Sequence, residues 1–344
     1  MPGMNGYERV MAALDLEEPD RIPTFEWSIN RRVRDGIYPG VSEFDFVEKT
    51  DLDGVAVYAD YETERLTETT YRDEWGITYA ETEEDYPTSI DFPVKEPEQL
   101  EELVVPDPCA PRRFESLREA VKRFKGKRAI LFRLRDAYSL PRYLRGMHNI
   151  MMDFALNADL VRRLVDISID YYTEMAHCAM ELGADVFWTS DDYCDNRGPI
   201  MGPDPWHEFI LPGLTRLIEE IRKEGYHFIK HNDGNINSIL PDMVEAGISC
   251  IDPIDAEAGM SLKEVKDTYG DRIAVKGGMP VNGVLVDGNE DDVVHAVRRC
   301  ISEGARGGGY ILSSSSDIIA SVNPENYRVM LEAVREYGKY PLRF

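Results

Sequence analysis

The sequence predicts an α/β protein of the (β/α)8 TIM barrel class, with one insertion after the second strand. Short apolar runs of four to eight residues recur along the chain, as expected for strands buried on both faces of a parallel sheet. A helical pattern follows each run, and eight such units in one chain favour a closed barrel. No glycine-rich dinucleotide fingerprint follows the first run, which argues against an open doubly wound sheet, the alternative fold. The expected strands are Ile22 to Trp27, Gly54 to Tyr58, Ala129 to Leu134, Asp185 to Ser190, Tyr226 to His231, Ser249 to Asp252, Arg272 to Gly277 and Gly309 to Ser313.

The expected helices lie between these runs and repeat apolar residues every three to four positions. Asn323 before Pro324 has the pattern of a helix N-cap followed by proline in the first turn. No linker or shift in composition divides the chain, so residues 1–344 are expected to form a single domain. The expected helices span Leu160 to Leu182, Pro205 to Lys223, Ile236 to Ala246, Asp291 to Glu303 and Pro324 to Tyr337.

Residues 61–108 differ from the rest of the chain. They include an acidic run from Glu81 to Asp85 and a strand-like stretch from Trp75 to Ala80. We expect an insertion near the barrel mouth that forms a hairpin over it. A plain solvated loop is the alternative.

Charge and composition argue against several classes of partner. The 39 Lys and Arg residues against 64 Asp and Glu residues give a net charge of -25, which repels nucleic acids and anionic membranes. The sequence shows no signal peptide and no apolar stretch long enough to span a membrane. The five cysteines are scattered without a CxxC pair, which predicts neither a disulfide framework nor a zinc ribbon and fits a reducing cytoplasm.

The candidate site consists of the residues that follow each strand, because TIM-barrel enzymes carry their chemistry at the C-terminal strand ends. Several carboxylates would converge there, and carboxylates packed together must take up protons or bind cations. These acids are Glu26, Asp60, Asp191, Asp192, Asp233 and Asp252.

Two arrangements would relieve the repulsion between these acids. In one, a metal ion is bound by His231, Asp233 and one of Asp191 or Asp192. His231 is the strongest single candidate for a metal ligand or an acid/base catalyst, because it alone of the six histidines ends an expected strand before a glycine-containing turn. A histidine with a purely structural role is the alternative. In the other arrangement, cationic side chains pair with the acids or hold an anionic substrate. These cations are Arg31, Arg133, Arg135 and Lys276.

Several segments together resemble the uroporphyrinogen decarboxylase superfamily nearly end to end. The resemblance implies a (β/α)8 barrel, in agreement with the strand pattern. The segments are Arg9-Val10-Met11-Ala12-Ala13-Leu14 with Pro19-Asp20-Arg21-Ile22-Pro23, Gly183-Ala184-Asp185 with Asp191-Asp192 and Met201-Gly202-Pro203, His231-Asn232-Asp233-Gly234-Asn235, and Gly307-Gly308-Gly309-Tyr310-Ile311-Leu312 with Asn323-Pro324-Glu325-Asn326.

The resemblance implies one of two activities: decarboxylation of uroporphyrinogen, or methyl transfer involving a corrinoid carried on a partner protein. Decarboxylases of the family have an Arg-Gln-Ala-Gly-Arg loop after the first strand and a histidine after the last, where this chain has residues 28–34 and Ser316. The thiol methyltransferases bind zinc through His-x-Cys and a later Cys. Here His231 is kept, but Asp233 and Ser316 stand at or near the cysteine positions. A His/Asp set suits an oxygen-bearing substrate, as in the O-demethylating branch.

We therefore expect a methyltransferase that moves a methyl group from a small methoxylated or N-methyl compound to a corrinoid on a partner protein. Zinc is one candidate for a metal that polarises the ether oxygen. Arg133 or Arg135 would stabilise the leaving oxyanion and Tyr193 would donate a proton. The expected substrate contacts are Glu26, Trp27, Arg31, Tyr58, Lys276 and Ser316.

Two alternatives remain open in the sequence. One is a cofactor-free decarboxylase in which Asp60 holds the substrate pyrrole nitrogens and residues 31–34 hold its carboxylates. The other is a non-catalytic homologue that binds a tetrapyrrole or corrinoid. The methyl donor and the oligomeric state, a homodimer included, are also left open.

Overall fold

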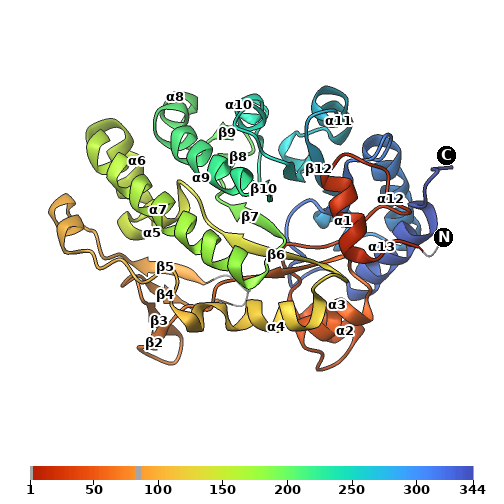
Figure 1. Cartoon of the computed structure of the whole chain (residues 1–344), viewed down its shortest axis with the longest axis horizontal. Helices are drawn as coiled ribbons and strands as arrows, with labels where there is room; N and C mark the ends of the chain where they lie inside the picture. Colours follow the sequence, from red (N-terminus) through yellow and green to blue (C-terminus); the bar gives the residue numbers. More distant parts are fainter. Residues whose placement is uncertain (1–2, 83–86, 344) are drawn as a thin grey trace.

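The computed structural model describes residues 3–82 and 87–343. Its main sheet is parallel, curled and seven-stranded, in the order β1-β6-β7-β10-β11-β12-β13. Figure 1 shows these strands at the centre with helices around them. The strands are β1 (Gly54–Val57), β6 (Ala129–Leu134), β7 (Val186–Ser190), β10 (His227–His231), β11 (Cys250–Ile254), β12 (Ala274–Met279) and β13 (Tyr310–Ser314).

The first expected strand, Ile22 to Trp27, completes this sheet through isolated contacts instead of a regular ladder. Thr24 forms a parallel bridge with Leu312 of β13. The Leu312 N–H donates to the Pro23 carbonyl (3.1 Å), and the Asp53 N–H donates to the Thr24 carbonyl (2.8 Å) just before β1. Pro23 has no N–H to donate, which explains the interrupted ladder. The segment therefore joins the last strand to the first, and the fold is a TIM barrel as predicted.

The helices pack around the sheet in chain order. Several helices match the expected ranges closely, because the sequence shows both the apolar spacing of a helix and its capping residues. They are α1 (Gly6–Leu14), α2 (Arg31–Ile37), α3 (Glu43–Lys49), α4 (Glu115–Phe124), α5 (Ser139–Arg145), α6 (Met147–Leu156), α7 (Ala158–Leu182), α8 (Pro203–Pro205), α9 (Leu211–Lys223), α10 (Leu240–Glu245), α11 (Leu262–Tyr269), α12 (Glu290–Gly304) and α13 (Pro324–Tyr337), with the short helical segments η1 (Pro97–Glu102), η2 (Pro111–Phe114), η3 (Trp206–Ile210), η4 (Ala256–Ala258) and η5 (Val281–Leu285).

The apolar core has two layers, because alternate side chains of each strand point inward and outward. The outer layer lies between the sheet and the helices. The inner layer fills the barrel, and α1 contributes Val10, Ala13 and Leu14 to it. Burial of these side chains is the main stabilising term. Polar side chains that form a cavity gather at the opposite end, where the strands finish.

The insertion between β1 and β6 contains an antiparallel sheet in the order β2-β3-β4-β5. Figure 1 shows it at one end of the molecule. The expected strand at Trp75 to Ala80 is present in part, as β4. Glu83, Glu84 and Asp85 of the acidic run lie outside the described residues. The strands are β2 (Thr63–Arg65), β3 (Thr70–Asp73), β4 (Thr78–Ala80) and β5 (Thr88–Asp91); a separate pair follows β7, namely β8 (Cys194–Asp195) and β9 (Gly198–Pro199).

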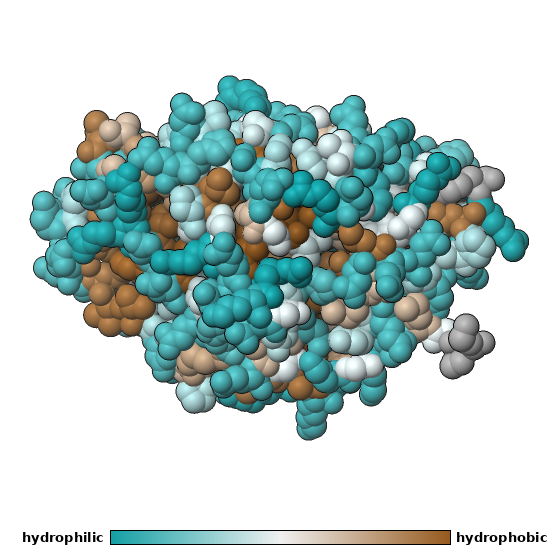
Figure 2. Space-filling model, turned by 45° about the horizontal axis from the view of Figure 1, so that its top comes forward, coloured by the Kyte–Doolittle hydropathy of each residue, from teal (hydrophilic) through white to brown (hydrophobic). Residues whose placement is uncertain are grey.

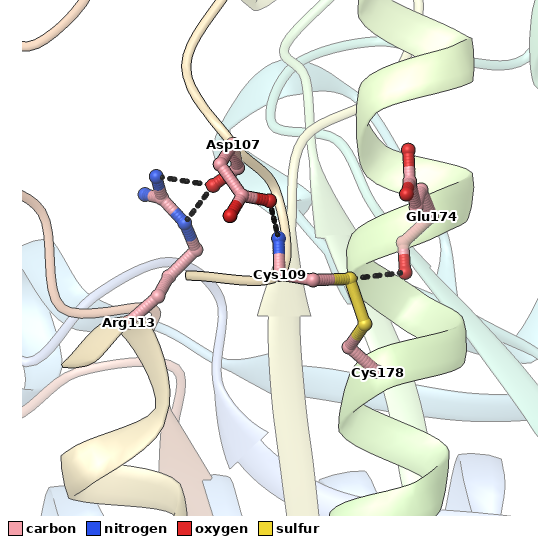
Figure 3. The surroundings of a disulfide bond; sticks show 5 residues. All are labelled: Asp107, Cys109, Arg113, Glu174 and Cys178. Carbon is pink, nitrogen blue, oxygen red and sulfur yellow. Dashed lines mark hydrogen bonds between the residues drawn. A yellow bond between two sulfur atoms is a disulfide. The ribbon is translucent and has the colours of Figure 1, made fainter. Parts of the chain in front are cut away.

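A disulfide joins Cys109 to Cys178 of α7 (Figure 3). The bond corrects the expectation that the scattered cysteines form no disulfide framework. The two cysteines are 69 residues apart, so their spacing in the sequence gave no sign of the bond. Arg113 of η2 donates to the Asp107 carbonyl from Nε (3.1 Å) and Nη2 (2.8 Å), which fixes the loop that carries Cys109. Disulfides are typical of oxidising compartments, so the cysteines no longer favour a reducing one.

The face of the molecule drawn in Figure 2 is mostly hydrophilic, in keeping with the net charge of -25. Figure 2 shows teal side chains over most of one face, with the largest brown patch toward the left. Within the described residues, no helix has the length and apolar character needed to cross a membrane.

Candidate active site

A cavity of about 230 Å³ opens at the C-terminal ends of the barrel strands. We call it the mouth cavity. It combines aromatic rings, arginines and acids around one histidine. Its lining residues are Trp27, Tyr58, Tyr61, Arg133, Leu134, Arg135, Ser139, Arg142, Tyr143, Ser190, Asp192, His231, Asp233 and Asp317.

His231 ends β10 and is buried in the wall of this cavity. In the parallel register it pairs with Ser190 of β7 on one side and Asp252 of β11 on the other. Neighbours in register point the same way, so the Asp252 carboxylate meets the imidazole, with Oδ2 2.7 Å from Nδ1. Trp27 stacks on the ring at 5.0 Å between centroids. These contacts fix the ring and leave Nε2 as the nitrogen that faces the mouth.

Two carboxylates approach that free nitrogen. The Oδ1 atom of Asp233 lies 3.6 Å from His231 Nε2, and the Oδ1 atom of Asp192 lies 3.9 Å from it. One ligand atom from each residue lies within 4.8 Å of the others, a grouping that could hold a metal ion. Asp233 Oδ2 accepts a hydrogen bond from Ser316 Oγ (3.1 Å), whereas its buried Oδ1 has no hydrogen-bond partner. We call Asp192, His231 and Asp233 the acidic triad.

The turn after His231 explains how the triad forms locally. Gly234 has a φ of +90°, and a Cβ there would lie 2.7 Å from the Asp195 carbonyl oxygen. Only glycine fits this left-handed, crowded position without strain. The turn returns the chain so that the Asp233 N–H donates to Asp192 Oδ1 (3.0 Å), which joins two members of the triad.

The electrostatics of the triad favour positive charge. Burial opposes a charge on His231, but the carboxylates of Asp233 and Asp252 outweigh it and raise the pKa of the imidazole to about 10. Burial raises the pKa of Asp233, against the effect of His231. Without another cation, the imidazole proton therefore compensates the acids.

The structure separates the two adjacent acids after β7. Asp191 is fully buried, and its Oδ2 accepts hydrogen bonds from the backbone N–H groups of Tyr138 and Ser139, both at 2.7 Å. It caps the start of α5 and does not line the mouth cavity. Asp192 does line the cavity, with its side chain half-exposed.

Of the predicted cations, Arg133 near the end of β6 and Arg135 directly after it reach the cavity. The Arg133 guanidinium lies between Trp27 and Tyr58, with Cζ 3.4 Å and 3.2 Å from the ring centroids. Its Nη1 donates to the Trp27 carbonyl (2.8 Å), whereas Nε and Nη2 are buried without a hydrogen-bond partner. Arg135 packs on Tyr143, with Cζ 4.8 Å from the centroid. Trp27 and Tyr58 thus line the cavity as expected for substrate contacts.

Several other predicted residues lie outside the cavity. Asp60 accepts hydrogen bonds from the Ser116 N–H (2.8 Å) and Oγ (2.6 Å) and so caps α4. Arg31 is an exposed residue of α2 that pairs with Asp35 (3.2 Å). Neither side chain lines the mouth.

Three further predicted residues are buried beneath the mouth. Tyr193 donates to Asp136 Oδ1, and Lys230 lies over its ring at 4.2 Å. Lys276 pairs with Asp252 at 2.7 Å. Glu26 accepts a hydrogen bond from Ser314 Oγ at 2.7 Å. These contacts make the three residues supporting side chains rather than part of the lining.

Four lining residues lie where the sequence placed the mouth: Leu134 and Ser190 end two expected strands, Asp317 follows the last one, and Tyr61 begins the insertion. The lining residues that sequence reasoning missed are Ser139, Arg142 and Tyr143, all of α5. Their approach to the mouth depends on how α5 packs after β6, which strand periodicity does not predict.

The fold and site together define a TIM-barrel protein with a polar, histidine-containing cavity at the C-terminal strand ends. Residues 47–337 match the family model of uroporphyrinogen decarboxylase (URO-D), and the chain belongs to this family.

The uroporphyrinogen decarboxylase of Syntrophotalea carbinolica is 27% identical over 180 residues, which are 52% of this chain and 48% of that protein. That of Xanthomonas oryzae is 25% identical over 154 residues, or 42% of each chain. The chain thus matches less than half the length of these curated relatives. Among solved structures, a methyltransferase from Methanosarcina mazei superimposes with a TM-score of 0.78 and 20% identity over 97% of this chain and 99% of that one, which shows a shared fold.

Proposed function

We propose that this protein is a methyltransferase that moves a methyl group from a small methoxylated or N-methyl compound to a corrinoid carried on a partner protein. A metal ion at the acidic triad would assist the transfer. The fold shared with a methyltransferase from Methanosarcina mazei supports the proposal.

The observation that carries the proposal is the triad on the wall of the mouth cavity. The buried Oδ1 of Asp233 has no donor, although an unpaired buried oxygen is costly. It faces His231 Nε2 at 3.6 Å, and Asp192 completes the group. One imidazole nitrogen and two carboxylate oxygens form a donor set that zinc accepts. The residues therefore fit a metal ion, and an ion there would satisfy the unpaired oxygen.

The chain's own residues supply the remaining requirements. When bound, a zinc ion acts as a Lewis acid on the oxygen of the methyl donor. Asp252 holds the His231 ring in orientation through Nδ1. Arg133 offers Nε and Nη2 to negative charge that develops on the oxygen as the methyl group leaves. Trp27 and Tyr58 keep that guanidinium in place and exclude water from one side.

A decarboxylase is the second candidate, and the arginines of the mouth favour it. Arg133, Arg135 and Arg142 all line the cavity and suit a substrate with carboxylates. The roles expected of Asp60 and residues 31–34 find no support, since Asp60 caps α4 and Arg31 is exposed. The acidic triad on the facing wall also disfavours a substrate with many carboxylates.

The deciding experiment measures methylation of a reduced corrinoid protein in the presence of a panel of methyl ethers and methylamines. His231→Ala should abolish transfer, whereas Asp242→Asn, which alters a surface His–Asp pair, should not. Turnover of uroporphyrinogen without any corrinoid would instead establish the decarboxylase. Tight corrinoid binding with no turnover of any donor would indicate the non-catalytic homologue.

A further inference from the structure

A second cavity, of about 390 Å³, adjoins the mouth cavity under the antiparallel sheet of the insertion. We call it the side chamber. Tyr61, Arg135 and Tyr143 line both cavities and therefore form the threshold between them. The side chamber is the larger of the two, and none of the roles assigned above uses it.

One face of the antiparallel sheet makes the chamber wall. Alternate residues of its strands line the chamber, namely Thr63 and Arg65 of β2, Tyr71 and Asp73 of β3, and Tyr79 of β4. Their neighbours Glu64, Arg72 and Thr78 do not line it. This alternation is the period of two expected of a strand with two different faces. In the register, Arg65 pairs with Tyr71 and Tyr71 with Tyr79, so these side chains form one row. The two tyrosine rings stack at 5.4 Å, which gives the chamber a flat aromatic wall.

Further aromatic residues line the chamber together with this row. They include Trp75, a buried residue between β3 and β4, and Tyr172 of α7. A chamber lined by this many rings favours a flat apolar body over a compact polar one.

Two arginines line the chamber, and one of them has no carboxylate partner among the described residues. Arg65 pairs with Glu81 at 2.7 Å. The Asp73 carboxylate accepts hydrogen bonds from the N–H groups of Trp75 (3.0 Å) and Ile77 (2.9 Å). No carboxylate of the described residues forms an ion pair with Arg135, whose guanidinium packs on the Tyr143 ring. A half-buried guanidinium at the threshold is therefore free to pair with an incoming anion.

We propose that the side chamber binds the flat body of an organic anion, an aromatic carboxylate or its equivalent, and that Arg135 pairs with its anionic group at the threshold. A ligand held in this way extends a neighbouring substituent into the mouth cavity, toward the acidic triad. The inference rests on the proposed function only where it calls this ligand the substrate. Arg135 thereby selects the substrate, and the insertion sheet exists in part to build the chamber.

Binding is tested with benzoate, its neutral isostere benzamide, the non-planar anion cyclohexanecarboxylate and the cation phenyltrimethylammonium, by titration calorimetry on the full chain. Benzoate should bind about tenfold or more tightly than each of the other three. Arg135→Gln should remove the preference for benzoate over benzamide, and Arg135→Lys should restore part of it. Arg72→Gln is the matched control, because Arg72 lies on the same strand as Tyr71 but points away from the chamber.

The position of the ligand is read from the four tryptophans, labelled as 5-fluorotryptophan and followed by fluorine NMR. Trp75 lines the side chamber and Trp27 the mouth, whereas Trp188 and Trp206 line neither cavity. Benzoate should shift the Trp75 resonance and leave those of Trp188 and Trp206 unchanged. Tighter binding of the cation, equal binding of benzoate and benzamide, or a shift of Trp27 without Trp75 would each overturn the proposal.

This experiment needs neither a corrinoid nor a methyl donor, so its outcome is separate from that of the proposed function. If benzoate binds in the side chamber but the protein transfers no methyl group, the proposed function is refuted and the proposed binding site stands. If the protein transfers methyl groups from small aliphatic donors and benzoate does not shift the Trp75 resonance, the binding site is refuted and the proposed function stands.

Discussion

The Nδ1 atom of His231 lies 2.7 Å from the Oδ2 atom of Asp252, and this contact leaves Nε2 as the nitrogen available to the mouth cavity. Asp252 is itself held by Lys276 (2.7 Å) and by the Trp188 indole N–H (3.1 Å). Lys276 and Asp252 thus form a line of buried contacts behind His231, the imidazole of the acidic triad.

Asp252→Asn should therefore weaken metal binding although Asp252 touches no metal. Loss of a carboxylate that orients a ligating histidine typically costs about 10–100-fold in metal affinity. Zinc affinity measured by competition with a chromophoric chelator checks this. Asp242→Asn, which alters the exposed contact of His207 with Asp242 (2.9 Å), is the matched control. An unchanged affinity in Asp252→Asn would mean that the ring orientation does not matter.

The adjacent acids Asp191 and Asp192 should have opposite phenotypes. Asp191→Asn weakens the cap of α5 and should lower the free energy of unfolding by about 1–3 kcal/mol while zinc still binds. Asp192→Asn should leave stability nearly unchanged, since the side chain is half-exposed, and should weaken zinc binding. Urea denaturation and metal titration of both variants decide the matter. Equal effects of the two substitutions on zinc binding would contradict the assignment.

Glu26 should make the protein less stable as the pH rises from about 4.5 to about 7. Burial raises the pKa of this carboxyl from 4.5 to about 7, despite Lys276 and Ser314. Between these values the unfolded chain loses the proton and the folded chain keeps it, so the free energy of unfolding falls by about 1–3 kcal/mol. Glu26→Gln should remove this loss. Urea denaturation at pH 5 and pH 8 measures it, and an identical pH dependence in the variant would refute the attribution.

The Cys109–Cys178 disulfide should stabilise the fold by about 2–4 kcal/mol, because it closes a long loop in the unfolded chain. A reductant should lower the melting temperature of the natural chain. The double variant Cys109→Ser, Cys178→Ser should melt at the lower temperature with or without reductant. Two free thiols at these positions in the oxidised protein, found by alkylation and mass spectrometry, would rule the bond out.

Strand pattern alone was enough to predict the barrel and most strand limits. β6 covers the expected range from Ala129 to Leu134, because six buried residues in a row leave little ambiguity. The pattern did not reveal that Ile22 to Trp27 would form only isolated contacts. Pro23 does indicate it, because proline cannot donate a hydrogen bond within a sheet. The disulfide had no sequence signal at all.

The site was predictable only to the level of strand ends. His231 and Asp233 could be identified because His231 ends β10 and Asp233 lies in the short turn that follows. Which of Asp191 and Asp192 faces the mouth depends on the backbone path after β7, and periodicity does not resolve that. Arg142 and Tyr143 come from α5, whose packing against the mouth is a tertiary property.

The most direct test of the account is the stoichiometry and affinity of zinc binding by the metal-free chain and by its variants His231→Ala and Asp233→Asn. Titration should give one zinc ion per natural chain, and each variant should lose that site while remaining folded by circular dichroism. No stoichiometric binding by the natural chain, or binding that survives both substitutions, would contradict the claim that these side chains hold a cation together.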